Sequence, residues 1–92
     1  MTENPKLIRV YTTNFCGYCI RAKRLLEARG LPYDEINLAG DPEARRTLMT
    51  QTKLRTLPQI FVGETFVGGS DDLARIDRSG ELQDLVQQAR TD

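Results

Sequence analysis

The sequence has no histidine among its 92 residues. This absence excludes a Cys–His nucleophilic pair, acid–base catalysis by an imidazole and a zinc site with histidine ligands. Cysteine is also scarce, because the chain contains only Cys16 and Cys19. Two cysteines cannot supply the four ligands of a tetrahedral zinc site. A disulfide across so short a loop would add little stability through loop-closure entropy, so we interpret the pair as reactive rather than structural.

The chain also lacks a charge surplus and a long hydrophobic run. Its 13 lysine and arginine residues balance 13 aspartate and glutamate residues, whereas a general nucleic-acid-binding protein needs a basic surplus. No segment approaches the roughly 18 consecutive apolar residues of a membrane span, and residues 1–6 do not have the pattern of a signal peptide. We therefore expect a cytoplasmic protein that binds neither nucleic acid nor membrane, with residues 1–92 forming a single domain.

Hydrophobic periodicity and turn residues predict an α/β fold with the element order β-α-β-α-β-β-α-α. Strands are expected at residues 7–11, 33–38, 59–62 and 65–67. Helices are expected from residue 16 to a stop at Gly30, from Pro42 to about Thr52, after Ser70 as N-cap, and over 81–89. The first two strands should be parallel, because a helix connects them. The later hairpin adds two strands to the same sheet, helices cover both faces, and the strand order stays open.

The two cysteines form a C-G-Y-C motif at the start of the first expected helix. Free N–H groups and the positive dipole end at a helix N-terminus stabilise a thiolate, which is the attacking species in thiol–disulfide exchange. Cys19 lies about one helical turn after Cys16, so its sulfur can reach the first. We assign Cys16 as the nucleophile and Cys19 as the less exposed resolving thiol. Three cations follow within two turns and add positive charge: Arg21, Lys23 and Arg24.

Separated motifs give the sequence a resemblance to the glutaredoxins of the thioredoxin-fold superfamily. These motifs include C-G-Y-C at 16–19, T-L-P-Q-I-F at 56–61 and G-G-S-D-D-L at 68–73, and the short length is similar to the small bacterial dithiol class. The resemblance implies a thioredoxin-like fold with a four-stranded mixed sheet flanked by helices. It also implies a cis Pro58 against the cysteine pair, with the backbone of Leu57 aimed toward a bound substrate. Without the resemblance, Pro58 would merely start an edge strand.

The same resemblance implies that glutathione is the reductant and co-substrate. Free N–H groups at a helix start suit its γ-glutamyl carboxylate, and a nearby aspartate suits its ammonium group. The residues implied there are Gly69, Ser70, Asp71 and Asp72. A plain helix cap is the alternative interpretation, and both can hold together.

Further contacts with glutathione are implied less directly. Family members often carry lysine at the position of Thr13, which puts a cationic contact with the glycine carboxylate in doubt there. Arg55 is the basic candidate for that contact, with Lys53 and Gln51 as lesser ones. Tyr18 would shield the thiols with its ring, or would be a half-exposed aromatic at the helix start.

The activity implied by the resemblance is reduction of glutathione mixed disulfides and protein disulfides, at a potential of about −200 to −230 mV. The partners would be glutathione and glutathionylated or disulfide-containing proteins, and the enzyme would be a monomer without a metal. Gly17 replaces the proline of the family's C-P-Y-C motif and frees the backbone there. The alternative is therefore a [2Fe-2S] cluster held in a dimer by two Cys16 and two glutathione thiols. A thioredoxin-like electron donor reduced by a flavoenzyme is a third possibility.

Overall fold

Eight elements follow one another in the order expected from the sequence. The computed structural model describes residues 7–91. The strands are β1 (Ile8–Thr12), β2 (Tyr33–Asn37), β3 (Gln59–Val62) and β4 (Thr65–Gly68). The helices are α1 (Gly17–Ala28), α2 (Pro42–Thr52), α3 (Ser70–Ser79) and α4 (Glu81–Thr91). The predicted element types are therefore confirmed, and the bounds differ by only one or two residues.

The four strands form one mixed sheet in the order β2-β1-β3-β4. The expected parallel pairing of β1 with β2 is confirmed, with Ile8 opposite Tyr33. β3 runs antiparallel to both β1 and β4. The strand that follows the T-L-P segment therefore lies at the centre of the sheet, beside the strand that leads to the cysteines.

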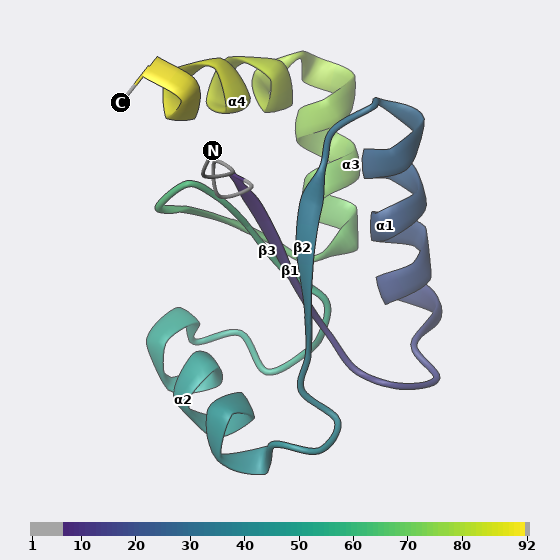
Figure 1. Cartoon of the computed structure of the whole chain (residues 1–92), viewed down its shortest axis with the longest axis vertical. Helices are drawn as coiled ribbons and strands as arrows, with labels where there is room; N and C mark the ends of the chain where they lie inside the picture. Colours follow the sequence, from purple (N-terminus) through teal and green to yellow (C-terminus); the bar gives the residue numbers. More distant parts are fainter. Residues whose placement is uncertain (1–6, 92) are drawn as a thin grey trace, which may run out of the picture.

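Helices cover both faces of the sheet (Figure 1). On one face α1, α3 and α4 bury an apolar core, whose main members are Ile8, Val10, Ala22, Leu26, Ile60, Val62, Leu73 and Leu82. On the other face α2 packs over a smaller cluster that contains Cys19, Leu38, Leu48 and Leu57. Each fully buried aliphatic side chain contributes about 1.5–3 kcal/mol to folding. The smaller cluster ties α2 directly to the surroundings of the cysteine pair.

Several helix ends match the sequence signals. The Asp41 carboxylate accepts a hydrogen bond from the Ala44 N–H at 3.0 Å, and Gly30 follows α1 with a φ of 68°. The start of α3 differs from the expectation, because Gly69 is the N-cap and Ser70 is already helical. The reason is that the Asp72 carboxylate accepts the Gly69 N–H at 3.0 Å. This bond caps the helix from inside, so that Ser70 is not needed as a cap.

Candidate active site

Cys16 occupies the N-cap position of α1. The Cys19 N–H donates a hydrogen bond to Cys16 Sγ at 3.1 Å, so the sulfur takes the place that a serine or aspartate oxygen fills in other helices. A thiolate accepts such a bond better than a neutral thiol, and the positive end of the helix favours it further. The site thus stabilises the charged form of Cys16 with the backbone of α1.

The two cysteines differ in accessibility, as the sequence predicts. They are joined in a disulfide, the oxidised form of the pair. Cys19 is only 2% exposed, whereas Cys16 is partly exposed. A substrate disulfide can reach Cys16 from solvent, while Cys19 is accessible mainly to Cys16. This asymmetry agrees with the roles of nucleophile and resolving thiol.

The peptide bond between Leu57 and Pro58 is cis, which confirms the expectation from the resemblance. The Leu57 carbonyl oxygen lies 3.8 Å from Cys16 Sγ. Leu57 and Pro58 are both buried. The segment before β3 therefore faces the nucleophilic sulfur with its backbone.

Gln59 holds this segment in place, and sequence analysis gave it no role. Its side chain is fully buried, and its amide group donates to the carbonyl oxygens of Leu54 at 2.6 Å and Thr56 at 3.1 Å. Its own oxygen accepts from the Thr52 hydroxyl at 2.8 Å. A glutamine at the start of the otherwise apolar strand expected over 59–62 is the one sequence signal that could have suggested this role.

A groove of about 420 Å³ begins at the cysteine motif and follows the T-L-P segment to the start of α3. It brings together seven of the nine residues expected to bind glutathione. Its lining consists of Tyr18, Leu54, Thr56, Leu57, Pro58, Gly69, Ser70, Asp71 and Asp72. The groove therefore joins the N-termini of α1 and α3 across the segment before β3.

The α3 end of this groove contains an unpartnered polar atom. Ser70 is 6% exposed, and its Oγ has no hydrogen-bond partner within residues 7–91. A buried hydroxyl without a partner costs about 1–3 kcal/mol. Asp72 beside it already accepts the Gly69 N–H, whereas Asp71 is exposed and lies 3.9 Å from Arg21 in an ion pair. This end of the groove offers N–H groups, a hydroxyl and two carboxylates.

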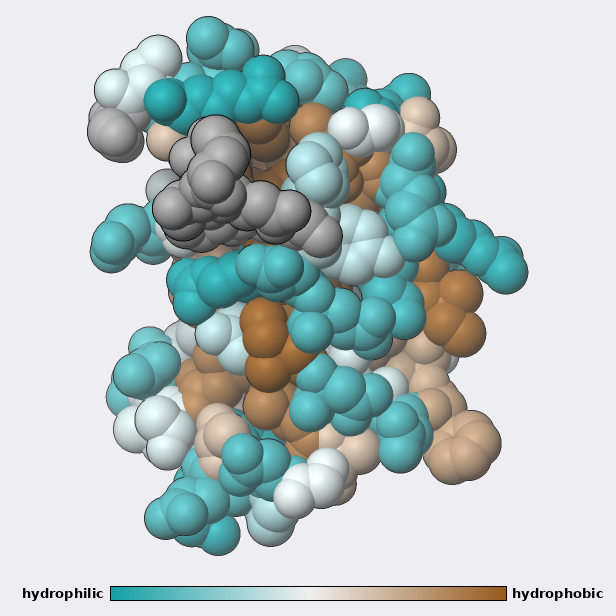
Figure 2. Space-filling view, in the orientation of Figure 1, coloured by the Kyte–Doolittle hydropathy of each residue, from teal (hydrophilic) through white to brown (hydrophobic). Residues whose placement is uncertain are grey.

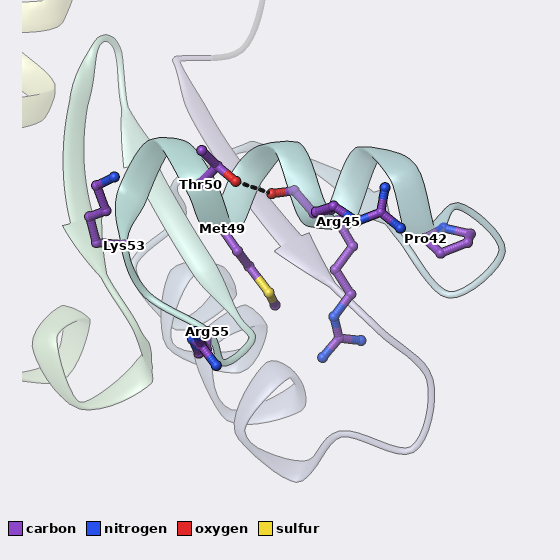
Figure 3. A pocket seen from close by; sticks show the side chains of 7 residues that line it. Pro42, Arg45, Met49, Thr50, Lys53 and Arg55 are labelled. Atoms are coloured by element: carbon purple, nitrogen blue, oxygen red, sulfur yellow. Dashed lines mark hydrogen bonds between the residues drawn. The ribbon is translucent and has the colours of Figure 1, made fainter.

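Two of the expected residues lie outside the groove. Arg55 lines a neighbouring groove of about 620 Å³ beside α2 (Figure 3). Thr13 is half-buried between β1 and α1 and lines neither groove. Of the lesser candidates, Lys53 accompanies Arg55, and Gln51 is exposed on α2.

The cations of α1 contribute less charge to the site than their sequence positions suggest. Lys23 forms an ion pair with Glu35 at 3.1 Å. The hydrogen bond from Thr12, assisted by Lys23, holds the pKa of Glu35 below its ordinary value. Arg21 lies over the Tyr18 ring, with 5.6 Å between its guanidinium carbon and the ring centroid, and pairs with Asp71 as described. Arg21 and Lys23 are thus each paired with a carboxylate, and the group that directly contacts Cys16 Sγ is the Cys19 N–H at the helix N-terminus.

Apolar side chains surround the entrance to the cysteine pair. The exposed large hydrophobic residues in the described part of the chain are Phe15, Tyr18 and Ile20. Figure 2 shows apolar residues at the surface along the edge formed by α1 and the loop before it. Phe15 directly precedes the nucleophile and has a φ of 55°, which is uncommon for a bulky residue. This left-handed turn points the ring into solvent at the mouth of the site.

Comparisons with known proteins agree with this geometry. The family model for glutaredoxin matches residues 8–67. The chain belongs to the glutaredoxin family. A glutaredoxin of Pseudomonas aeruginosa is 48% identical over 77 residues, which cover 84% of this chain and 92% of that protein. Glutaredoxin 3 of Escherichia coli K12 is 35% identical over 80 residues, covering 87% and 96%.

Solved glutaredoxin structures share the fold. The buckwheat glutaredoxin–glutathione complex superposes with a TM-score of 0.84 at 31% identity, covering 90% of this chain and 78% of that one. The holo form of glutaredoxin C1 from Populus tremula x tremuloides gives a TM-score of 0.88 at 30% identity, covering 96% and 82%. Family membership together with the C-x-x-C pair makes this chain a thiol–disulfide oxidoreductase.

Two further properties concern only the part of the chain that the structure describes. No helix in it is long and apolar enough to cross a membrane. No group of three or more histidine, cysteine or acidic side chains lies close enough together there to hold a metal ion.

Proposed function

We propose that this protein uses glutathione to reduce glutathione mixed disulfides and protein disulfides. The observation that carries the proposal is the groove that joins the Cys16 end of α1 to the start of α3. A γ-glutamyl carboxylate needs hydrogen-bond donors, and the start of α3 offers free N–H groups together with the unpartnered Ser70 hydroxyl. The carboxylate of Asp71 or Asp72 suits the ammonium group of glutathione.

The rest of glutathione would follow the groove toward the nucleophile. The backbone of Leu57 would face the cysteinyl residue of glutathione, whose sulfur would then lie next to Cys16. The Tyr18 ring would cover one side of that sulfur. Arg55 remains the candidate for the glycine carboxylate, because it lies two residues before Leu57, although its side chain points into the neighbouring groove.

The proposed reaction has two exchange steps. The Cys16 thiolate attacks the glutathionyl sulfur of a mixed disulfide, and the partner protein leaves as a thiolate that takes a proton from water. The thiolate of a second glutathione then attacks the glutathionyl sulfur on Cys16, releasing glutathione disulfide and restoring the Cys16 thiolate. With a protein disulfide, the Cys16 thiolate attacks one sulfur and the other sulfur of the substrate leaves as a thiolate. Cys19, as its thiolate, then attacks Cys16 Sγ, which releases the second substrate thiolate and closes the Cys16–Cys19 disulfide. Two glutathione thiolates reduce this disulfide in turn and leave as glutathione disulfide.

A coupled assay with glutathione, glutathione reductase and NADPH tests the proposal. The wild type should reduce a small glutathione mixed disulfide, and Cys16→Ser should reduce the rate to that of the uncatalysed reaction. Cys19→Ser should keep this activity but lose the reduction of protein disulfides, because only the second reaction needs a resolving thiol. Full activity of Cys16→Ser would refute the proposal. Turnover supported only by a thioredoxin-reducing flavoenzyme would favour the electron-donor alternative.

A [2Fe-2S] cluster between two copies is the second candidate, and Gly17 is the observation that favours it. Gly17 has open space around its Cβ position, so the motif lacks the bulk and rigidity that proline would bring. One chain offers only Cys16 as an accessible thiolate, so a cluster would need two chains and two glutathione thiols. Anaerobic reconstitution with iron, sulfide and glutathione should give a coloured dimer. A colourless monomer would contradict this candidate.

A further inference from the structure

The groove beside α2 is lined by an unusual share of cationic side chains. Its seven lining residues include no carboxylate and are Pro42, Arg45, Arg46, Met49, Thr50, Lys53 and Arg55. Segment 42–55 contains four cations and a single acidic residue, whereas the whole chain has no net charge. A local surplus of positive charge therefore lies on one side of the active site, and we call this surface the basic groove.

The cations of the basic groove are available for a partner. Within residues 7–91, ion pairs involve cations on other elements, namely Arg21, Lys23, Arg29 and Arg75. None of them involves a cation of the basic groove. Arg46 and Lys53 are also exposed, whereas Arg55, equally exposed, is the candidate for the glycine carboxylate of glutathione. Unpaired like charges so close together repel one another, so a negatively charged ligand would relieve the repulsion.

The basic groove adjoins the proposed glutathione groove. Along segment 53–56, the side chains of Lys53 and Arg55 line the basic groove, while those of Leu54 and Thr56 line the other one. Leu57, whose carbonyl oxygen lies 3.8 Å from Cys16 Sγ, follows directly. Arg55 is two residues away, at most about 7 Å between Cα atoms. Four extended residues of a bound peptide span about 13 Å and would reach from the reacting sulfur into the basic groove.

We propose that the basic groove binds an acidic segment of the protein substrate, adjacent in sequence to the cysteine that carries the disulfide. This inference rests on the proposed function and names the class of protein that the enzyme prefers. Met49 points into the space between α2 and Arg55 (Figure 3), so it gives an apolar floor for peptide side chains. The lining contains no aromatic ring on which a nucleic-acid base could stack, which favours a protein partner.

Three eight-residue peptides test the proposal, each joined to glutathione through one central cysteine. Their flanking residues are acidic, amide or basic, and otherwise match. An exposed charge pair contributes roughly 1.4- to 5-fold in affinity, so two pairs predict that kcat/KM of the wild type is about 2- to 30-fold higher for the acidic than for the amide peptide. The preference should disappear when NaCl is raised from about 0.05 M to about 0.5 M, because salt screens exposed charges.

Charge-matched variants assign the preference to the basic groove. The double variant Arg45→Gln/Arg46→Gln should lose most of the preference for the acidic over the amide peptide. Its kcat/KM for the amide peptide and for a small mixed disulfide should stay at the wild-type value. The control double variant Arg78→Gln/Arg90→Gln removes two cations from α3 and α4 and should keep the preference. Circular dichroism of both variants checks that they fold.

The outcomes separate this inference from the proposed function. A wild type that reduces neither the peptides nor the small mixed disulfide refutes the proposed function. A wild type that reduces all of them with equal kcat/KM overturns only the assignment of the basic groove. The assignment of the basic groove is also overturned if the two double variants lose the preference for the acidic peptide equally. The same holds if the protein binds a single-stranded oligonucleotide and shows no preference for the acidic peptide.

Discussion

Replacing Gln59 with methionine should loosen the segment that faces Cys16. Methionine has a similar volume, but it cannot replace the three hydrogen bonds of Gln59 to Thr52, Leu54 and Thr56. A typical intramolecular hydrogen bond contributes about 0.5–1.5 kcal/mol net, and buried partners left unsatisfied cost more. We expect Gln59→Met to lower the free energy of unfolding by about 3 kcal/mol. In a domain of this size this corresponds to a decrease in Tm of roughly 12–24 °C.

The same substitution should reduce activity, because residues 53–58 line both grooves and carry Leu57. Misplacing groups by about 1 Å can cost up to a hundredfold in rate, and we expect kcat/KM for a glutathione mixed disulfide to fall by at least about tenfold. Urea unfolding, hydrogen exchange of residues 53–57 and the coupled assay measure the three effects. Hydrogen exchange should become faster in this segment well before the whole protein unfolds.

Thr52→Val is the matched control for Gln59→Met. It removes the hydroxyl that donates to Gln59 and accepts the Leu54 N–H at 3.2 Å, but it keeps both bonds from Gln59 to the segment's carbonyls. It should lower the free energy of unfolding by about 1–2 kcal/mol and change kcat/KM by less than about twofold. If Gln59→Met stays within about 0.5 kcal/mol of the wild type, or if both variants lose activity equally, our interpretation of Gln59 is refuted.

Three more predictions concern the two ends of the site. Ser70→Ala should leave the free energy of unfolding unchanged or raise it by up to about 1 kcal/mol in urea unfolding, while the KM for glutathione rises; an unchanged KM would count against the proposed contact. Gly68→Ala should lower the free energy of unfolding by about 2 kcal/mol or more, because Gly68 has a φ of 120° and a Cβ there would overlap the Asp72 carboxylate. In the control Gly17→Ala the new Cβ has no neighbouring atom within 4 Å, so this variant should have the same Tm as the wild type. Thr12→Val should lower the free energy of unfolding by about 1 kcal/mol at neutral pH, because it removes the hydrogen bond from the Thr12 hydroxyl to Glu35. Because Thr12 lowers the folded-state pKa of Glu35, this stabilisation is present above the unfolded pKa of about 4.3 and is lost as pH falls through the lower folded value. If the difference in the free energy of unfolding between wild type and Thr12→Val does not change with pH, this prediction is contradicted.

Much of the fold could be predicted because local signals agree with the tertiary structure. Asp41 followed by Pro42 marks the start of α2, and Gly30 marks the end of α1, since each depends only on backbone geometry nearby. The strand order could not be predicted, because periodicity shows which side of a strand is buried but not which strand lies beside it. Thr12 lies just after the strand expected over 7–11, yet it ends β1 opposite Asn37, because its carbonyl oxygen accepts the Leu38 N–H at 2.9 Å.

The features of the candidate site that depend on backbone position alone could be predicted from the sequence. A cysteine at the first turn of a helix faces free N–H groups wherever the helix lies, so the asymmetry between Cys16 and Cys19 followed from spacing. The directions in which long side chains point could not be predicted from the sequence. Lys23 is drawn to Glu35 on β2, and Arg55 points away from the groove that contains its neighbours Leu54 and Thr56. These outcomes depend on contacts between distant segments.

Ser70 shows how the local sequence and the structure can disagree at the candidate site. A serine before two aspartates predicts an N-cap whose hydroxyl satisfies the helix, yet Asp72 takes over the capping and leaves the Ser70 hydroxyl buried without a partner. Buried polar groups in folded proteins nearly always have partners, so a folded chain keeps such an orphan at a cost in stability. An ordered water or a polar ligand that supplies the missing bond would offset that cost. The unsatisfied hydroxyl at the start of α3 therefore adds support to the proposal, carried by the groove itself, that a small polar substrate binds along the path to Cys16.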